Sequence, residues 1–410
     1  MLDFLKLAQK HKAQVLLLGD ITQLSAIEAG KPFEILQKQG IYLTTIDTIQ
    51  RQQTEVLKQV VQDIINDAPT KALNDLNEHG MVYQDKKSDC LQNIADEYAS
   101  MSSKERSSTL VVVGSNDDRH AVNNCIRERL QKDGVVDSKN VSIEVAQSRN
   151  MSKAMCKVAD SYQVGDLIRF GRNIKSHDIE KGQYAYVKEI NKKSNLIHLS
   201  IKSKEDEKEK LITINPKKYA SMTAYKPETR DFAVGDKIRI TQSSVKDHGL
   251  SGGQEMLVTG IEDGKIIATD GHRHKHEIDT DKWKHFDYAY SSTAYAAQGK
   301  SYKNVLAYID SNNRYLTNHK SFYVFVSRVK EKLKIYTNNK DKLLDRVTTK
   351  DTKTSVYDLF RDLDVKVHTE KEKSQAPVKE KPKNYLMDLI NAMHGKPKEK
   401  ENVADRERVR

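Results

Sequence analysis

Three short apolar runs, each bounded by glycine or polar residues, constrain the fold of this chain most strongly. They are 14–20 (Gln-Val-Leu-Leu-Leu-Gly-Asp), 109–114 (Thr-Leu-Val-Val-Val-Gly) and 303–309 (Lys-Asn-Val-Leu-Ala-Tyr-Ile). A continuous apolar run, unlike an alternating one, is typical of a strand buried on both faces of a parallel sheet. Amphipathic spacing predicts helices to cover that sheet over 53–67, 68–79, 90–102 and 117–130. We therefore predict an α/β fold.

The middle of the chain contains an internal repeat. Residues 162–170 (Tyr-Gln-Val-Gly-Asp-Leu-Ile-Arg-Phe) are echoed by 232–240 (Phe-Ala-Val-Gly-Asp-Lys-Ile-Arg-Ile), and a Gly-Gln pair and short alternating strands follow each copy. This pattern predicts two tandem small β-barrels of the SH3-like kind inserted into the α/β fold. The alternative interpretation is a chance similarity between two hairpins.

Composition limits the classes of protein to consider. Lys and Arg number 69 against 58 acidic residues, for a net charge of +11, which favours a polyanionic partner with nucleic acid first. The three cysteines lack metal-type spacing and imply no disulfide framework, and no apolar run is long enough to span a membrane. We expect a cytoplasmic protein without membrane insertion. From about residue 364 the chain becomes highly charged, with three of its seven prolines, which predicts a disordered tail.

The segment 18–33 suggests chemistry, because Asp20 and Gln23 directly follow a predicted strand. Ligands bind at the carboxyl ends of strands in α/β sheets, and an amide there can report a terminal phosphate. Taken alone, Gly-Asp-x-x-Gln-Leu is compatible with an ordinary loop. The whole segment, however, resembles the third motif of RecD-like superfamily 1 helicases, and its end, Glu-Ala-Gly-Lys-Pro-Phe, resembles conjugative relaxase-helicases.

Further motifs follow in the order that this resemblance requires: 45–52 (Thr-Ile-Asp-Thr-Ile-Gln-Arg-Gln), 291–299 (Ser-Ser-Thr-Ala-Tyr-Ala-Ala-Gln-Gly) and 323–328 (Tyr-Val-Phe-Val-Ser-Arg). The resemblance implies that Arg51 contacts the γ-phosphate of ATP and that Arg328 is an arginine finger. A guanidinium suits this task because it matches phosphate oxygens in a planar, bidentate way. A single arginine without this context is more often a surface ion-pair partner.

The same resemblance implies positions for nucleotide and single-stranded DNA. Gln298 and Gly299 are expected near the nucleotide and the DNA backbone, and Ser292 or Thr293 can add a hydroxyl contact. Tyr295 stands where many relatives have histidine, so it either stacks on DNA or belongs to the core. Arg119 and Asn123 are expected to touch single-stranded DNA; the alternative is a plain amphipathic helix.

In fold terms the resemblance implies partial RecA-like P-loop helicase lobes. We expect a remnant of the first lobe over 1–50, the second lobe over 51–160 and 286–348, the barrel insertion over 161–285, and a helix and tail over 349–410. No Gly-x-x-x-x-Gly-Lys-Ser/Thr sequence and no Walker B strand occur, so the expectation is an internal start, an artificial start or a truncated reading frame.

These expectations lead to a functional prediction: the C-terminal portion of an ATP-dependent 5′-to-3′ DNA helicase of a conjugative relaxase, inactive alone. ATP and Mg²⁺ would act in the intact parent, with no Mg²⁺ ligands in this chain. Expected partners are single-stranded DNA and the missing helicase and relaxase part. The basic end 406–410 is similar to tails that send conjugative substrates to a secretion channel, which would add a type IV secretion coupling protein as a partner; a solvated run of charges is the favoured interpretation. The alternative is a non-catalytic DNA-binding or regulatory module.

The sequence contains one possible metal site. His272, His274 and His276 would lie on one face of a strand if 271–276 were extended. A basic strand facing water or nucleic acid is the favoured interpretation, so no metal is predicted.

Overall fold

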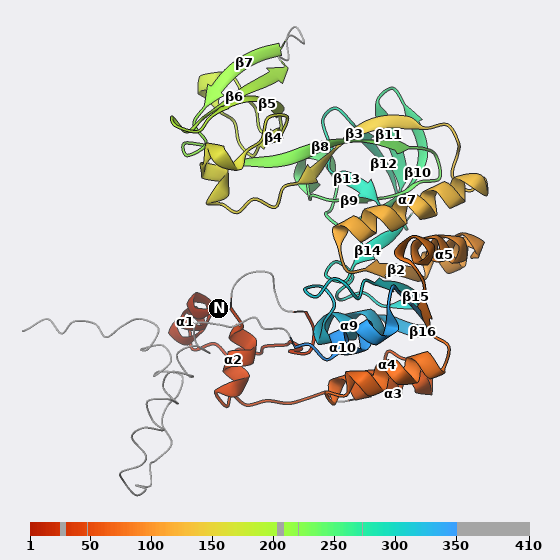
Figure 1. Ribbon diagram of the computed structural model, residues 1–410. Coiled ribbons are helices and arrows are strands. Elements are labelled where there is room, and N and C mark those ends of the chain that lie inside the picture. The colour runs from red at the N-terminus through yellow and green to blue at the C-terminus, as the bar shows by residue number, and fades with distance from the viewer. Residues whose placement is uncertain (25–29, 47, 203–208, 220, 273, 351–410) are drawn as a thin grey trace, which may run out of the picture.

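The computed structural model describes residues 1–24, 30–46, 48–202, 209–219, 221–272 and 274–350 (Figure 1). The predicted tail from about residue 364, with the basic end 406–410, lies outside these described residues, as does a helix that the apolar spacing of 385–393 predicts. None of the helices in the described part of the chain is both long and apolar enough to cross a membrane.

A five-stranded parallel sheet forms the centre of one lobe. Its strand order is β1-β16-β15-β2-β14, with all neighbours parallel. The strands are β1 Val82–Gln84, β2 Thr109–Val113, β14 Ser291–Thr293, β15 Tyr302–Ile309 and β16 Val329–Thr337. The predictions of strands over 109–114 and 303–309 are confirmed, and every residue of β2 is buried, as a central parallel strand requires.

Helices cover both faces of this sheet, as the amphipathic spacing predicted. One hydrophobic cluster joins one sheet face to α3 Glu55–Ile65, α4 Pro69–Glu78, α9 His319–Ser327 and α10 Lys340–Val347. The other face packs against α5 Lys87–Ser100 and α7 Asn116–Lys132. A short helix, α6 Ser103–Ser107, precedes β2. Helix starts follow local chemistry: Thr54 and Ser115 accept backbone N–H bonds as caps of α3 and α7.

Two antiparallel sheets lie between β2 and β14 in the sequence (Figure 1). The six-stranded sheet has the order β3-β8-β4-β5-β6-β7, and the five-stranded sheet has the order β12-β11-β10-β9-β13. The bounds of the first sheet are β3 Val141–Ser148, β4 Leu167–Phe170, β5 Tyr184–Asn191, β6 Leu196–Lys202, β7 Glu209–Ile214 and β8 Met222–Phe232. Those of the second are β9 Lys237–Ile240, β10 Glu255–Glu262, β11 Lys265–Thr269, β12 Lys275–Asp279 and β13 Phe286–Tyr288, with the short helix α8 Val245–His248 after β9.

The sequence repeat is also a repeat of backbone hydrogen bonds. In the first copy Gly165 N–H donates to Val187 and Gly182 N–H donates to Phe170. The second copy has the same two bonds, from Gly235 to Val258 and from Gly253 to Ile240. Chance similarity between two hairpins does not explain this agreement. The two antiparallel sheets therefore contain equivalent β motifs.

The antiparallel region is wider than the range 161–285 expected for it. β3, which pairs with β8, begins at Val141, and β13, which pairs with β9, ends at Tyr288. β3 and β13 lie outside the two repeated segments, so the repeat alone could not predict that they belong to the antiparallel sheets.

The predicted strand over 14–20 is wrong for this structure. Leu16 and Leu18 are 83% and 84% exposed, and no strand within the described ranges pairs with this segment. An apolar run becomes a buried strand only where neighbouring strands receive it. The segment instead connects α1 Leu2–Lys10 to the loop before α2 Pro32–Lys38, and α1 has no buried residue.

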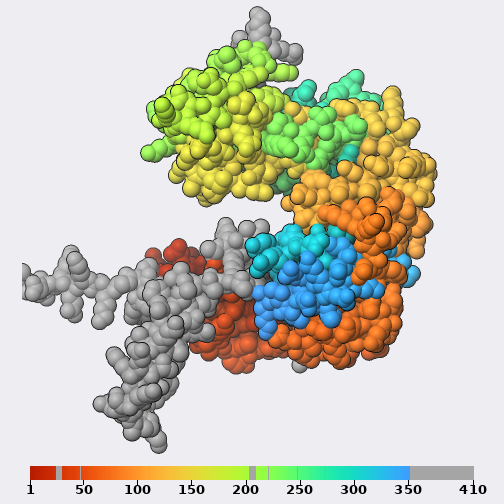
Figure 2. Space-filling model, viewed as in Figure 1, coloured from red at the N-terminus to blue at the C-terminus, as the bar shows by residue number. Residues whose placement is uncertain are grey.

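Figure 2 shows a deep hollow between the yellow-green end of the antiparallel region, formed by β4–β7, and the lobe that contains the parallel sheet. Residues coloured cyan, which include the connection from β14 to β15, border this hollow.

Candidate functional site

Segment 51–53 lies alongside the start of β16 and brings two arginines to one edge of the parallel sheet. The buried Gln52 amide donates to the carbonyl of Val329 at 2.9 Å, and Gln53 N–H donates to Lys330 at 2.8 Å. The Arg51 guanidinium donates to the carbonyl of Ser327. Arg51 therefore lies beside Arg328, which directly precedes β16.

The loop carrying Asp20 and Gln23 reaches the same place. Arg328 Nη2 lies 3.4 Å from Gln23 Oε1, and Gln23 Nε2 donates to Asp20 at 3.0 Å. Gln298 Nε2 lies 3.3 Å from the carbonyl oxygen of Leu24. The structure thus brings Asp20, Gln23, Arg51, Gln298 and Arg328 together from four separate segments.

This cluster lies at the amino end of β16, whereas the sequence argument placed a ligand at a strand's carboxyl end. Arg328 accepts the backbone bond from Tyr302, the first residue of β15, at 3.0 Å. The difference arises because segment 14–20 does not form a strand here. Its loop docks instead on the edge where β15 and β16 begin.

Arg328 is unusually placed for a charged residue. It is 1% exposed, and its Nε has no hydrogen-bond partner. Burial lowers the pKa of Arg328, and the neighbouring Arg51 lowers it further. Two cations this close favour an anion between them. The donor set therefore fits a phosphate, which a guanidinium can bind through several N–H groups.

Asp20 remains ionised despite its position. Burial raises the pKa of Asp20, but hydrogen bonds from Thr22, Gln23 and Tyr323 outweigh burial and leave the pKa below its usual value. Tyr323 Oη lies 3.3 Å from Asp20 Oδ2. Burial and Asp20 together raise the pKa of Tyr323, so Tyr323 keeps its proton and its hydroxyl donates a hydrogen bond to Asp20.

Sequence reasoning did not assign a role to Tyr323 or Gln52. Both stand inside quoted motifs, Tyr323 at the start of 323–328 and Gln52 at the end of 45–52. The sequence signal that could have identified them is their place in the same motifs as Arg51 and Arg328. Gln52 holds segment 51–53 to β16, and Tyr323 holds the Asp20 loop to α9.

The predicted DNA-contact residues fall into two groups. Ser292 and Thr293 form the carboxyl end of β14 and are half-buried, and Tyr295 is 40% exposed in the turn that follows. That turn leads through Gln298 to Gly299, whose φ of +79° lies in the left-handed region that favours glycine. One short segment thus connects the strand end to the arginine cluster.

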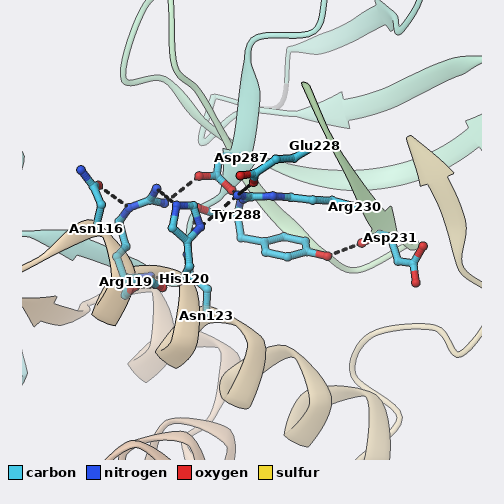
Figure 3. A network of polar contacts seen from close by, with 10 residues as sticks. Asn116, Arg119, His120, Asn123, Glu228, Arg230, Asp231, Asp287 and Tyr288 are labelled. Atoms are coloured by element: carbon cyan, nitrogen blue, oxygen red, sulfur yellow. Dashed lines mark hydrogen bonds and ion pairs between the residues drawn. The ribbon is translucent and has the colours of Figure 1, made fainter. Parts of the chain in front are cut away.

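Arg119 and Asn123 form the second group and are buried. They are 3% and 1% exposed, so neither is part of a plain amphipathic surface. Arg119 donates to Asp287 at 2.7 Å (Figure 3). Asn123 accepts from Ser291 N–H at 2.8 Å. DNA contact by these two residues stays a prediction.

The three histidines do not share a strand face. β12 begins at Lys275, so His276 alone of the three lies on it. The backbone N–H groups of His272 and His274 donate to Asp270, and these bonds help to lower the pKa of Asp270 to about 2 against the opposing effect of burial. Asp270 therefore organises this loop as an acceptor of backbone bonds.

The chain is similar to several known proteins. A family profile described as an AAA domain matches residues 1–87. "Multifunctional conjugation protein TraI" of Escherichia coli (strain K12) is 24% identical over 83% of this chain, and a second Escherichia coli TraI is 23% identical over 83%. The chain spans about a fifth of the length of these curated relatives, 21% in each case.

Solved helicase structures are also similar at a lower level. A Bacteroides sp Pif1 in complex with ADP-AlF4 is 14% identical, covering 89% of this chain and 71% of that one, with a TM-score of 0.35. A structure of two coordinating Pif1 helicases at forked double-stranded DNA is 12% identical, covering 79% and 54%, with a TM-score of 0.35.

Proposed function

Because this chain is a relative of the TraI-type, RecD-like superfamily 1 helicases, we propose that it is the C-terminal portion of an ATP-dependent 5′-to-3′ DNA helicase of a conjugative relaxase. The observation that carries this proposal is the convergence of Gln23, Arg51, Gln298 and Arg328 on one sheet edge. In this proposal the lobe with the parallel sheet is RecA-like, and the two antiparallel β motifs are SH3-like barrels.

The arginine cluster is proposed to sense the γ-phosphate of ATP. ATP, when bound in the intact parent with Mg²⁺, supplies the phosphoanhydride bond that is hydrolysed. Arg51 and Arg328 would hold the terminal phosphate, and Gln23 would orient the Arg328 guanidinium through the contact at 3.4 Å. Gln298 would link this response to the turn after β14, since it belongs to that turn and its amide contacts the carbonyl of Leu24 beside Gln23.

Single-stranded DNA is proposed to bind at the carboxyl end of β14 and the turn that follows it. Ser292 and Thr293 offer hydroxyls at the end of β14, and Tyr295 offers an exposed ring for stacking. The hollow bordered by the β14–β15 connection gives such a strand a path (Figure 2). The net charge of +11 favours a polyanion.

The missing partner is proposed to dock on segment 14–18. Leu16 and Leu18 are 83% and 84% exposed. Neighbouring apolar side chains that are this exposed are typical of a surface that binds another protein segment. Strands of a phosphate-binding lobe, supplied by the rest of the parent or by another chain, would bury them.

Two measurements test the proposal. The chain should bind a labelled oligo(dT) with an affinity that falls linearly with log salt concentration in fluorescence anisotropy, because counterions are released. No binding at low salt would remove the DNA assignment. The chain should also show no ATPase turnover with single-stranded DNA present. Robust turnover that is lost in Arg328→Ala but kept in Arg129→Ala would refute inactivity; Arg129 is a half-exposed arginine of α7 that pairs with Asp96 and Asp133.

A non-catalytic DNA-binding or regulatory module is the second candidate. It is favoured by the absence of any phosphate-loop sequence in the chain. The coding sequence upstream of the first codon separates the two candidates. An in-frame phosphate loop supports the helicase portion, whereas an intact unrelated gene supports the module.

A further inference from the structure

One face of α7 carries three buried polar residues, Arg119, Asn123 and Arg127, which we call the α7 polar stripe. Their spacing of four residues places them above one another on a helix. They are 3%, 1% and 7% exposed. Buried arginines are rare unless they are paired, so this stripe needs partners.

Each member of the stripe has a partner in or next to the second antiparallel sheet: Asp287 lies in β13, Asp236 directly precedes β9, and Ser291 begins β14 just after β13. Arg119 donates to Asp287 at 2.7 Å, and Arg127 Nε donates to both carboxylate oxygens of Asp236 at 2.9 and 3.0 Å. Asn123 Oδ1 accepts from the backbone N–H of Ser291 at 2.8 Å and from its hydroxyl at 2.7 Å. The stripe therefore joins α7 to the antiparallel region.

Asp287 also binds a second arginine. Arg230 of β8 donates to Asp287 through one nitrogen and to Glu228 through the other at 2.8 Å (Figure 3). Burial raises the pKa of Asp287, but Arg119 and Arg230 outweigh burial and hold that pKa below its usual value. Two arginines thus face two carboxylates, and the buried charge is balanced.

The crossing between the two kinds of sheet is very short. β13 ends at Tyr288 in the antiparallel sheet, and β14 begins at Ser291 in the parallel sheet. α7 holds Asp287 before this crossing and Ser291 after it. The residues that follow at once are Ser292 and Thr293.

We propose that the α7 polar stripe positions Ser292 and Thr293 for single-stranded DNA, and that Arg119 and Asn123 do this without touching the DNA. This inference rests on the proposed function in taking Ser292 and Thr293 as DNA contacts. The guanidinium nitrogens of Arg119 already contact Asn116, Asp287 and His120, so a DNA phosphate would have to displace one of these partners. Displacing Asp287 would leave that buried carboxylate with one arginine fewer. The polar groups of the stripe thus bind other residues of the protein and not DNA.

The salt dependence of oligo(dT) binding distinguishes positioning from contact. Loss of one phosphate contact lowers the slope of log affinity against log salt by about 1. If Arg119 is a positioning residue, Arg119→Gln and Asp287→Asn each weaken binding by about fivefold or more, in the range of couplings between sites, with an unchanged slope. The double variant is then no weaker than the single ones. The control is Arg129→Gln, which changes a half-exposed arginine of α7 that pairs with Asp96 and Asp133 rather than with Asp287 or Ser291; it retains wild-type binding.

Two results would overturn the inference. One is a smaller slope of log affinity against log salt concentration for Arg119→Gln, which would mean that Arg119 contacts a phosphate. The other is unchanged or tighter binding by Asp287→Asn, which would mean that Arg119, released from Asp287, binds DNA. Because buried-charge variants can unfold, Ser291→Ala provides a milder change, removing one hydroxyl bond to Asn123.

Hydrogen exchange tests the positioning without DNA. Amides over 288–299 should exchange faster in Ser291→Ala and Asp287→Asn than in wild type or Arg129→Gln. Unchanged exchange there would refute the inference even if DNA binds. If wild type binds no DNA, the proposed function fails, and the exchange result still decides whether the stripe orders Ser292 and Thr293.

Discussion

The two Val-Gly-Asp aspartates give a matched test of how burial sets the strength of an ion pair. Asp236 is fully buried and accepts from Arg127, from Tyr290 Oη at 2.6 Å and from Ala233 N–H at 2.7 Å. Asp166 occupies the equivalent position in the first copy and pairs with Arg149, whose side chain is 20% exposed against 8% for Arg127.

Replacing each aspartate by alanine should therefore have unequal effects. Asp236→Ala leaves a buried guanidinium without its counter-ion, a change that costs about 3–5 kcal/mol. In Asp166→Ala water can reach Arg149, so we expect a loss of about 1–3 kcal/mol, the cost of unsatisfied polar groups. Asp236→Asn, which keeps the shape and one acceptor oxygen, should fall between wild type and Asp236→Ala.

The assay is urea unfolding followed by fluorescence of Trp283, the single tryptophan of the chain, which is 1% exposed in the same hydrophobic cluster as β9 and β13. The free energy of unfolding should decrease more for Asp236→Ala than for Asp166→Ala. Equal losses, or a larger loss for Asp166→Ala, would refute the reasoning that solvent access to the arginine decides the cost.

Three further outcomes are expected. Gly235→Ala should destabilise more than Gly165→Ala in thermal unfolding, because both have φ near +90° (92° and 91°) but only at Gly235 would a Cβ meet a backbone oxygen, that of Val135, at 2.5 Å. Gln52→Leu should cost about 1–3 kcal/mol and speed proteolysis near residue 50, since it removes the amide donor to two backbone carbonyls; unaltered cleavage would contradict this anchor. Burial, with a smaller effect of Arg169, lowers the pKa of His285 to about 3. The unfolded chain, with a histidine pKa near 6.5, then binds the extra proton, so stability should rise with pH between about 3 and 6.5 by up to about 1.4 kcal/mol per pH unit, and His285→Phe should flatten this dependence in urea titrations.

Apolar runs and helical spacing along the sequence predicted the longer strands and helices. β2 and β15 carry long apolar runs, and α3 to α5 carry helical spacing, so all were predicted close to their observed bounds. β1 and β14 are three residues long and have no such signal. Segment 14–20 has a strong strand signal but no neighbouring strand within the described ranges, and the outcome depended on that neighbour.

The candidate site divides in the same way. Motif order predicted that Arg51 and Arg328 belong together, and the structure brings them to one edge. The burial of Arg119 could not be predicted, because its partner Asp287 is 168 residues away in the sequence. The prediction for the histidine segment was wrong because the backbone N–H groups of His272 and His274 donate to the Asp270 side chain, and β12 begins only at Lys275.

The α7 polar stripe also restricts how this sequence can change over evolutionary time. Loss of Arg119 alone leaves Asp287 with one arginine, and loss of Asp287 alone removes the carboxylate that Arg119 and Arg230 share. Either intermediate would be purged if stability is marginal. We therefore expect homologous sequences to exchange residues 119, 230 and 287 as a set, so that covariation among these positions, distant in sequence, should exceed covariation with their immediate neighbours.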